Sequence, residues 1–560
     1  MKPNKDILLE VNNLNISIAQ NQSSKSLVKN ISFNIKKNEI IGLIGESGSG
    51  KSLTSLAVLN LLNKDKFKVT GEVLFKGIDL LKISEGEMLK NRGAEISMIF
   101  QEPMSALNPT MKIGDQLYEM YKAHQNKSFL EITNRIKKLI KKVKLEGVEN
   151  LFEKYPHEIS GGQKQRVMIV MALACNPKLL IADEPTTALD VTVQKEIIDI
   201  LKLLQKSEGL SILFISHDLK LVSKITDRLV ILKDGVVVET GINKKIFKGP
   251  ISDYTKALLS VIINPKKRLK TLPTIETYES NKKLLKENKS QRRKRQKKIY
   301  SNEPILRVNN VSKFYNASSN LFQKNKEYQA LNNICLKLYA GETLGLIGES
   351  GSGKTTLSNA ILKIHNFEKG KIYFKEKDIS NLKGKDLLNF RKKVQIIFQD
   401  PYASLNPVQK IQDAIIEPLK YHQQISGQKE VEKKTIQLLK DVGLDESFLS
   451  RYPHELSGGQ RQRVCIARAI SLKPEIIICD ECVSALDVSV QATILNLLNS
   501  LKEKYGFTYI FISHDLSVVK YMSDRIVVLF DGEIVEYQEA DKMFLKPTND
   551  YTRKLIKASL

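Results

Sequence analysis

The chain of 560 residues lacks long apolar runs. Nowhere do 18 apolar residues follow one another, so the sequence offers no candidate for a membrane-spanning helix. Its first residues, MKPNKDILLEVNN, have no apolar core of the kind that a signal peptide requires. We therefore expect a cytosolic chain that reaches a membrane only by docking on it.

Cysteines are few and odd in number: Cys175, Cys335, Cys465, Cys479 and Cys482. Most of them stand in apolar runs, which disfavours a disulfide framework and indicates a reducing compartment. Cys479 and Cys482 form a Cys-x-x-Cys pair, but no second pair follows at the spacing of a zinc site. We therefore predict no metal site on cysteine.

Positive charge is in excess, with 88 Lys and Arg against 62 Asp and Glu and a net charge of +26. Such an excess favours an anionic partner, which includes a membrane surface, a nucleic acid and a nucleotide. A lysine-rich surface without any such partner is an equally good interpretation. The length suits two large domains with a linker.

A long internal repeat organises the chain. Its period, near 300 residues, is too long for a solenoid and indicates a duplicated domain. The offset is 297 residues at most repeated positions and 303 at the glycine-rich loops. The repeated pairs are Val11 and Val308 at the start of a VNN run, Gly45–Ser52 and Gly348–Thr355, Tyr155–Gln163 and Tyr452–Gln460, and Ser216–Asp218 and Ser513–Asp515.

A basic segment separates the two copies. Residues Asn281 to Tyr300 contain ten Lys or Arg and one Glu. Because such a run cannot build a core, we predict a solvated linker, with contact to anionic lipid headgroups as the alternative. The predicted domains are residues 5–262 and 304–560, joined by a basic linker at 263–303.

Within each copy, short β-rich apolar runs alternate with helical stretches, which predicts a mostly parallel α/β sheet. In the first copy the runs are Glu39–Ile44, Leu179–Ala182 and Ser211–Ile215, and a helix is predicted from Lys51. Residues 110–154 and their counterparts 408–451 lack the strand rhythm and are predicted to be helical.

The glycine-rich loops match G-x-x-x-x-G-K-[ST] between a strand and a helix, a specific signal for phosphate binding. Glycines let backbone N–H groups surround a phosphate, and the helix that follows presents its positive end. Lys51 and Lys354 should neutralise the β- and γ-phosphates, and Ser52 and Thr355 should bind Mg²⁺. The candidate ATP-binding residues of the loops are Gly45, Glu46, Ser47, Gly48, Ser49, Gly50, Lys51 and Ser52, and Gly348, Glu349, Ser350, Gly351, Ser352, Gly353, Lys354, Thr355 and Thr356.

Two acids end a later apolar strand in each copy, Asp183-Glu184 and Asp480-Glu481. The carboxyl end of a parallel strand is where an α/β site lies. We predict that Asp183 and Asp480 help to hold Mg²⁺. Glu184 and Glu481 are the predicted general bases that polarise the attacking water.

These motifs, together with a repeated Ser-Gly-Gly-Gln, resemble those of the ATP-binding-cassette (ABC) ATPases. The resemblance covers nearly the whole chain apart from the linker, and implies two P-loop NTPase domains in tandem, each a mostly parallel sheet with a helical subdomain. It also implies roles for further residues. The signature motifs are Ser160, Gly161, Gly162 and Gln163 in the first half, and Ser457, Gly458, Gly459 and Gln460 in the second. The residues that sense Mg²⁺ and water are Gln101 and Gln399. The switch histidines are His217 and His514.

In that family two cassettes pair head to tail, and ATP lies between one glycine loop and the other signature. The resemblance thus implies two complete composite sites within this chain. One combines Lys51, Gln101, Glu184 and His217 with Ser457 and Gly459, and the other combines Lys354, Gln399, Glu481 and His514 with Ser160 and Gly162.

The halves depart from the family pattern at two places. The aromatic residue expected to stack on adenine is Tyr315 in the second half, where the first half has Ile18. Cys482 stands where the first half has Pro185, and its thiol is a candidate for oxidation sensitivity.

A repeated stretch, Gln101–Pro109 and Gln399–Pro407, resembles the ATPases of dipeptide, oligopeptide and nickel importers, and fused pairs resemble those of microcin-C-like peptide and glutathione importers. The resemblance implies ATP and Mg²⁺ as cofactors, and as partners two membrane permease subunits and an extracytoplasmic solute-binding protein. It implies a peripheral place on the cytoplasmic face of the inner membrane and no nucleic acid. Residues 260–300 hold no cysteine, so no iron–sulfur cluster is predicted.

The alternative function is a soluble tandem-cassette ATPase that acts on ribosomes, where the positive charge would serve RNA binding. Such proteins usually carry a long helical arm between cassettes, and this linker is short. A DNA-repair ATPase is disfavoured because its zinc-binding cysteines are missing. The solute itself does not follow from the sequence.

Overall fold

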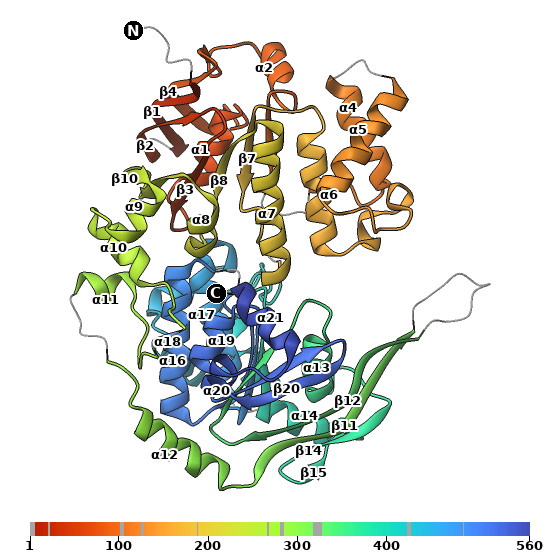
Figure 1. Ribbon diagram of the computed structural model, residues 1–560. Helices are drawn as coiled ribbons and strands as arrows, with labels where there is room; N and C mark the ends of the chain where they lie inside the picture. Colours follow the sequence, from red (N-terminus) through yellow and green to blue (C-terminus); the bar gives the residue numbers. More distant parts are fainter. Residues whose placement is uncertain are drawn as a thin grey trace. The chain divides into compact units, whose positions relative to one another are not determined.

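The computed structural model describes residues 6–20, 23–100, 106–124, 128–187, 189–265, 268–280, 285–316, 327–422, 427–484 and 486–559. The chain divides into two compact units (Figure 1). The first is Met1–Leu189 with Val193–Ile262, and the second is Ile263–Leu560 with Asp190–Thr192. Both units contain the same succession of elements, as the sequence repeat predicts.

A six-stranded sheet forms the centre of the first unit, in the order β10-β9-β3-β8-β7-β6. Every pairing except that of β9 with β10 is parallel. Strands β3, β7 and β8 are buried along their whole length, which explains their unbroken apolar sequences. The mostly parallel sheet is thereby confirmed. The strands are β3 (Ile40–Gly45), β6 (Ile96–Ile99), β7 (Leu179–Asp183), β8 (Ser211–Ile215), β9 (Arg228–Lys233) and β10 (Val236–Ile242).

A second, antiparallel sheet of the first unit has the order β2-β1-β4-β5. Its strands are β1 (Ile7–Gln20), β2 (Ser23–Lys36), β4 (Phe67–Phe75) and β5 (Ile78–Asp79). Alternate residues such as Leu9, Val11 and Val73 are buried in one core together with residues of the parallel sheet. Sequence analysis predicted no separate sheet here.

Helices cover the sheets of the first unit, and α4, α5 and α6 gather into a group beside them (Figure 1). Of this group, α4 and α5 lie in the region predicted to be helical, residues 110–154. Helix α5 begins at a capping box in which Ser128 accepts from the Glu131 N–H. The helices are α1 (Lys51–Val58), α2 (Glu85–Asn91), α4 (Ile113–His124), α5 (Phe129–Lys142), α6 (Gly161–Leu173), α7 (Val191–Glu208), α8 (Leu219–Ile225), α9 (Asn243–Lys248) and α10 (Asp253–Ser260), with short 3₁₀ turns η1 (Leu151–Glu153) and η2 (Pro156–Glu158).

The second unit repeats both sheets, in the orders β12-β11-β14-β15 and β16-β17-β18-β13-β19-β20. Its strands are β11 (Pro304–Asn316), β12 (Glu327–Tyr339), β13 (Thr343–Ile347), β14 (Lys369–Phe374), β15 (Lys377–Asp378), β16 (Val394–Ile397), β17 (Ile476–Asp480), β18 (Thr508–Ile512), β19 (Arg525–Phe530) and β20 (Glu533–Glu539). Its helices are α13 (Lys354–Ile361), α14 (Gly384–Lys393), α15 (Ile411–Tyr421), α16 (Gln428–Asp441), α17 (Gly458–Ile470), α18 (Val488–Tyr505), α19 (Leu516–Met522), α20 (Ala540–Leu545) and α21 (Asp550–Ser559), with η3 (Glu446–Phe448) and η4 (Pro453–Glu455).

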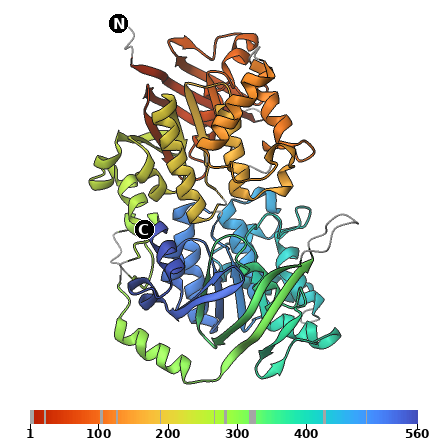
Figure 2. The same ribbon diagram turned by 45° about the vertical axis from the view of Figure 1, so that its right-hand side comes forward.

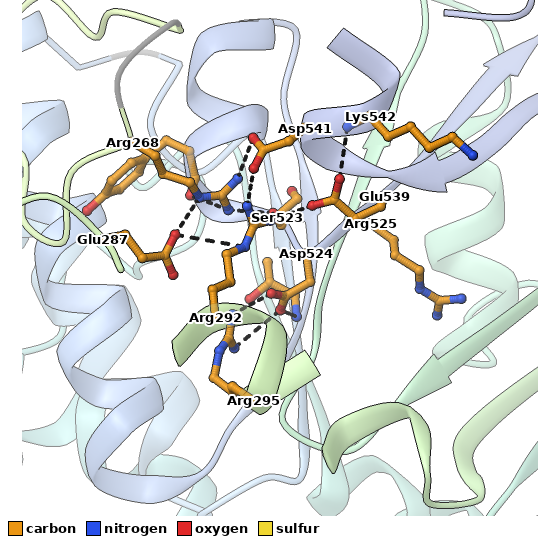
Figure 3. Close-up of polar contacts among 12 residues, drawn as sticks. Arg268, Glu287, Arg292, Arg295, Ser523, Asp524, Arg525, Glu539, Asp541 and Lys542 are labelled. Atoms are coloured by element: carbon orange, nitrogen blue, oxygen red, sulfur yellow. Dashed lines mark hydrogen bonds and ion pairs between the residues drawn. The ribbon is translucent and has the colours of Figure 1, made fainter. Parts of the chain in front are cut away.

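The basic linker contains α11 (Ile275–Glu279) and α12 (Lys289–Tyr300), and it belongs to the second compact unit. Figure 2 shows α12, in light green, leading directly into the long strand β11. Arg292 and Ile299 of α12 are buried, so the prediction of a solvated linker is wrong for these two residues. The physical reason is that Arg292 has acidic partners on the second unit (Figure 3). Arg293 and Lys294 are exposed, as predicted for the whole run.

None of the helices in the described parts of the chain is both long enough and apolar enough to span a membrane.

Candidate active site

The glycine-rich loop of each unit joins the central strand of the parallel sheet to a helix. Strand β3 ends at Gly45 and α1 begins at Lys51, and the second unit repeats this with β13 and α13. Gly48 and Gly50 have φ of 78° and 96°, left-handed values that favour glycine. The N-cap residue Gly50 offers no side chain to the first N–H groups of α1. The loop therefore presents backbone donors and a helix N-terminus to an anion.

Close packing explains why the first glycine of the loop is required. A Cβ atom at Gly45 would lie 2.3 Å from the Leu232 carbonyl oxygen, and one at Gly348 would lie 2.3 Å from that of Leu529. Any side chain would therefore displace the loop from the neighbouring strand β9 or β19.

The lysine of each loop is buried and bonded to the loop itself. Lys51 Nζ donates to the carbonyl oxygens of Gly45 and Glu46, both at 2.8 Å. Lys354 Nζ makes the same two bonds, to Gly348 and Glu349. Burial lowers the pKa of Lys354, although nearby carboxylates oppose this. These ammonium groups are held at the mouth of the loop, where a phosphate would lie.

Asp183 ends strand β7 and is 5% exposed. Burial, followed by the charge of Glu184, raises the pKa of Asp183 to about 6 against a hydrogen bond from Ser52. Its Oδ1 is buried without a hydrogen-bond partner among the described residues. A carboxylate oxygen with no partner, next to a serine hydroxyl, suits a hard cation such as Mg²⁺. Asp480 resembles it, with a pKa raised to about 6 by burial and by Glu481.

Glu184 and Glu481 have unusual backbone conformations, with φ of 48° and 47°. For a residue with a side chain this left-handed region costs free energy, and it persists only where surrounding contacts hold it. Here the N–H of Glu184 donates to the Ile215 carbonyl at 2.9 Å, and that of Glu481 to Ile512 at 3.0 Å. Each bond ties the acid to the end of the neighbouring strand, β8 or β18.

A histidine faces each of these glutamates. The distance from His217 Nδ1 to Glu184 Oε1 is 2.9 Å, and that from His514 Nδ1 to Glu481 Oε2 is 3.3 Å. Burial alone would raise the pKa of Glu184, but the hydrogen bond and charge of His217 outweigh it and lower the pKa. The pKa of Glu481 is lowered in the same way. Both glutamates are therefore carboxylates near neutral pH and can accept a proton.

Gln399 completes this group in the second unit, because its Nε2 donates to Glu481 Oε2 at 3.0 Å. The structure thus brings Gln399, Glu481 and His514 together, as the sequence predicts. Gln101, the counterpart in the first unit, lies outside the described residues.

The signature residues form the start of helices α6 and α17. Ser160 Oγ accepts from the Gln163 N–H at 3.3 Å, and Gln163 Oε1 accepts from the Ser160 N–H at 2.9 Å. Ser457 and Gln460 form the same capping box. Because the hydroxyl serves as an acceptor in the cap, its own proton can still be donated to an anion.

The third signature position is glycine for a steric reason. A Cβ atom at Gly162 would lie 2.7 Å from Val193 Cγ1 of α7, and one at Gly459 would lie 2.5 Å from Val490 Cγ1 of α18. The signature helix is therefore packed against the helix that follows the catalytic acids.

Sequence reasoning missed the role of two tyrosines. Tyr551 of α21 accepts from the Glu349 N–H at 3.0 Å through its hydroxyl oxygen. Tyr254 of α10 lies equivalently, and its hydroxyl donates to Glu46 Oε2 at 3.3 Å. Each tyrosine thus contacts the second residue of a phosphate loop. The signal was present as a repeated Asp-Tyr-Thr, which the sequence analysis did not connect with the loop.

The structure also describes Tyr315 and Cys482, the residues of the second half at the two positions where the halves differ. Tyr315 on β11 is 38% exposed, so its ring is accessible, and Lys313 Nζ lies 5.1 Å from the ring centroid. Cys479 and Cys482 are both buried. A hydrogen bond from Cys482, together with burial, raises the pKa of Cys479. Buried thiols react slowly with oxidants, which argues against the oxidation sensitivity predicted for Cys482.

Comparison with known proteins gives consistent matches. The model of the family "ABC transporter" matches residues 28–187 and 331–484, and that of "Oligopeptide/dipeptide transporter, C-terminal region" matches residues 238–295. The glutathione import ATP-binding proteins GsiA of Escherichia coli O157:H7 and O6:H1 are 42% and 43% identical over 98% of this chain and 89% of their own. A solved dimeric ATP-binding cassette, MJ0796 bound to ADP and Pi, is 31% identical over 42% of this chain and 98% of its own, with a TM-score of 0.38.

Proposed function

Because this chain belongs to the ABC transporter family and carries two of its ATPase domains, we propose that it energises a membrane importer of small peptides. It is an ATP-binding and ATP-hydrolysing transport subunit. The observation that supports this most strongly is the duplicated group of a loop lysine, two strand-end acids and a histidine. The comparisons lend no support to the ribosome alternative.

Each ATP is held between the phosphate loop of one half and the signature of the other. The signature residues support this arrangement, since an exposed helix N-terminus with a serine hydroxyl is a second anion site. The first composite site contains Lys51, Gln101, Glu184 and His217 with Ser457 and Gly459. The second contains Lys354, Gln399, Glu481 and His514 with Ser160 and Gly162.

Hydrolysis is an in-line displacement on the γ-phosphorus. A water oxygen forms the new bond to phosphorus, the bond to the bridging oxygen of ADP breaks, and Glu184 or Glu481 accepts the water proton. The lowered pKa keeps both glutamates ionised, so that each can accept a hydrogen bond from the water and then its proton. His217 and His514 hold the glutamates in place and contact the γ-phosphate, and Lys51 and Lys354 neutralise the charge that develops.

Mg²⁺, when bound, would neutralise phosphate charge. Ser52, Gln101 and Asp183 would hold it in the first site, and Thr355, Gln399 and Asp480 in the second. The unpartnered Oδ1 of Asp183 is the feature of the chain that fits such an ion.

The partners are two membrane permease subunits, with a solute-binding protein on the outer side of the membrane, and the chain lies on the cytoplasmic face of the inner membrane. Large apolar side chains in the helical regions support docking there. Phe129 on α5 is 71% exposed, and Val408 before α15 is 79% exposed. The relatives are named for glutathione import, so glutathione and other short peptides are the solutes to test.

Single substitutions at the two bases test the enzymatic part. Glu184→Gln and Glu481→Gln should each lower kcat for ATP at least twofold, because each removes the proton acceptor of one of the two sites. Glu119→Gln, at an exposed acid of α4, is the control and should leave kcat unchanged. If either active-site variant kept full activity, two hydrolysing sites would be wrong.

Affinity purification tests the transport part. Tagged chain isolated from detergent-solubilised membranes should bring down two polytopic permease subunits. Recovery of ribosomes without membrane proteins would instead establish the soluble alternative.

A further inference from the structure

A tyrosine near the start of α10 and of α21 lies against the phosphate loop of its own half. The hydroxyl oxygen of Tyr551 accepts from the Glu349 N–H at 3.0 Å, and the hydroxyl of Tyr254 donates to Glu46 Oε2 at 3.3 Å. Neither tyrosine is part of the phosphate loop, the strand-end acids or the signature. We propose that each tyrosine is a positioning residue, which fixes the phosphate loop in the shape that binds ATP. This inference deepens the proposed function and rests on it, because it requires that the loops bind ATP.

The hydrogen bond to Tyr551 acts on a single peptide group of the loop. The N–H of Glu349 and the carbonyl of Gly348 belong to the same planar peptide. That carbonyl accepts from Lys354 Nζ at 2.8 Å. The peptide is therefore held at both ends, by the tyrosine and by the loop lysine. A rotation of this peptide would move the oxygen that holds the lysine, so Tyr551 acts on Lys354 through it.

The first half has the same arrangement at its own loop. Burial and the charge of Glu46 raise the pKa of Tyr254, and a hydrogen bond with the Glu46 backbone opposes this rise. The Glu46 N–H shares its peptide with the Gly45 carbonyl, which accepts from Lys51 Nζ at 2.8 Å. A hydroxyl can donate one hydrogen bond and accept two, so Tyr254 can bond both the backbone and the carboxylate of Glu46.

The second residue of each loop also holds the residues that follow it. The Glu349 carbonyl accepts from Lys354 Nζ at 2.8 Å and from the Ser352 N–H at 3.2 Å. The turn closed by the second of these bonds includes Gly351, with a φ of 82°. Glu46 makes the same two bonds in the first half. A shift at the residue that the tyrosine holds would therefore spread to the lysine and to the turn.

A buried carboxylate attaches the turn before each tyrosine to the cassette. Glu536 of β20 accepts from the Thr548 N–H at 2.9 Å and from the Asn549 N–H at 3.1 Å. Asn549 Oδ1 in turn accepts from the Tyr551 N–H at 2.8 Å. Glu239 of β10 makes two bonds of the same kind to the turn before α10. Each tyrosine therefore stands on a fixed backbone, which a residue that positions a loop requires.

The two tyrosine rings have different neighbours. Lys233 Nζ lies 4.9 Å from the ring centroid of Tyr254, whereas the ring centroids of Phe530 and Tyr551 are 4.4 Å apart. Lys233 and Phe530 occupy equivalent places, as the last residues of β9 and β19. The packing of the ring thus differs between the halves, whereas the contact of the hydroxyl with the loop is present in both. The hydroxyl contact is therefore the common feature, and it is the one that the proposal uses.

A loop fixed in this way favours binding of ATP more than the chemical step. A phosphate is bound by several backbone N–H groups at once, so a loop that is already in the right shape loses less entropy on binding. The proposed base Glu481 follows β17 and is bonded to the end of β18, so its geometry does not depend on the tyrosine. Loss of the hydroxyl should therefore weaken affinity for ATP and leave kcat nearly unchanged.

Hydrogen exchange of the full chain without nucleotide tests the hold on the loop. Tyr551→Phe should raise amide exchange in residues 348–353 about fivefold, because the Glu349 N–H loses its acceptor. Tyr537→Phe is the control, since its hydroxyl donates to the Lys337 carbonyl at 2.8 Å in the same half, and it should leave loop exchange unchanged. Amides of α21 report whether the helix remains folded. Equal loop exchange in wild type and Tyr551→Phe would overturn the proposal, whatever the fate of the proposed function.

ATP titration tests the consequence for binding. In a Lys51→Ala chain, which leaves the second loop intact, Tyr551→Phe should raise the Kd for ATP about fivefold. Glu536→Gln should shift the Kd in the same direction, because it loosens the turn that carries the tyrosine, and Tyr537→Phe should not shift it. An unchanged Kd in Tyr551→Phe, with loop exchange raised, would show that the tyrosine does not set the shape that binds ATP. Absence of ATP binding in the wild type would instead overturn the proposed function, a failure that the exchange experiment does not share.

Discussion

The two halves carry the same framework at one edge of the central sheet and differ in what binds there. In each half, an aspartate just before β9 or β19 accepts a hydrogen bond from the first N–H of the phosphate-loop strand. The arginine that follows this aspartate pairs with the glutamate that precedes the phosphate-loop strand. These residues are Asp227, Arg228 and Glu39, and Asp524, Arg525 and Glu342. Only the second half adds Glu539 and Asp541, in place of Ile242 and Lys244.

The residues proposed for hydrolysis, in contrast, have closely similar arrangements in the two halves. Both bases have φ near 47°, both face a histidine, and both loop lysines make the same two bonds. The hydrolytic residues are therefore arranged alike in the two halves, whereas only the second half carries the acidic residues that bind the linker.

The largest expected difference between the halves concerns Asp524 and Asp227. Asp524→Asn removes the partner of Arg295 and of buried Lys502, and should lower the free energy of unfolding of the second half by about 3 kcal/mol. Asp227→Asn should cost the first half about 1 kcal/mol, because the described residues give it a backbone N–H as partner. Denaturant unfolding followed by hydrogen exchange of each half measures both values.

Acid should reveal the same difference. Burial opposes ionisation of Asp524, but Lys502, Arg295 and Arg292 lower its pKa to about 2 from an ordinary 3.8. A lowered pKa means that the stabilisation is complete above about pH 4 and is lost as pH falls towards 2. The second half of the Asp524→Asn variant should therefore lose less stability over this range than the wild type. An identical loss in both would contradict the role of Asp524.

A middle-sized effect is expected at Tyr551. Tyr551→Phe keeps the ring but leaves the Glu349 N–H without its acceptor, so KM for ATP should rise about three- to fivefold with kcat nearly unchanged. Tyr509→Phe is the matched control, because its hydroxyl donates to the Leu498 carbonyl at 2.9 Å, within the same half. The control should lower thermal stability and leave KM unchanged. An equal rise in KM for ATP in both variants would show that Tyr551 acts only through the stability of the second half.

The smallest effect should come from adenine stacking. Tyr315→Ile should weaken nucleotide binding to the second phosphate loop about fivefold, and Ile18→Tyr should strengthen binding to the first. Fluorescent ATP titrations in Lys51→Ala and Lys354→Ala backgrounds separate the two loops. No change from either substitution would remove adenine contact as a difference between the halves.

Much of the site could be predicted because its residues form local patterns. The glycine loop, the strand-end acids and the histidines each stand beside a buried strand, and the repeat shows each pattern twice. Gln399, Glu481 and His514 then meet because parallel strands end at one edge of the sheet.

The linker could not be predicted in this way. Ten cations with one acid, Glu287, indicate solvation, and the sequence near Arg292 does not show its other acidic partners. Its acids lie 249 residues away at Asp541, and at Glu539. Tyr551 was missed for the same reason, because it contacts a loop residue 202 positions earlier.

Occlusion of ATP in combined variants tests the central claim, two composite sites of equal chemistry, most directly. In a chain with Glu184→Gln and Glu481→Gln, which binds ATP without hydrolysing it, Lys51→Ala can be combined with either signature substitution. With Ser457→Arg, both lesions fall in one site, and one ATP per chain should remain occluded. With Ser160→Arg, both sites are damaged and none should remain. The reverse pattern would contradict the head-to-tail arrangement.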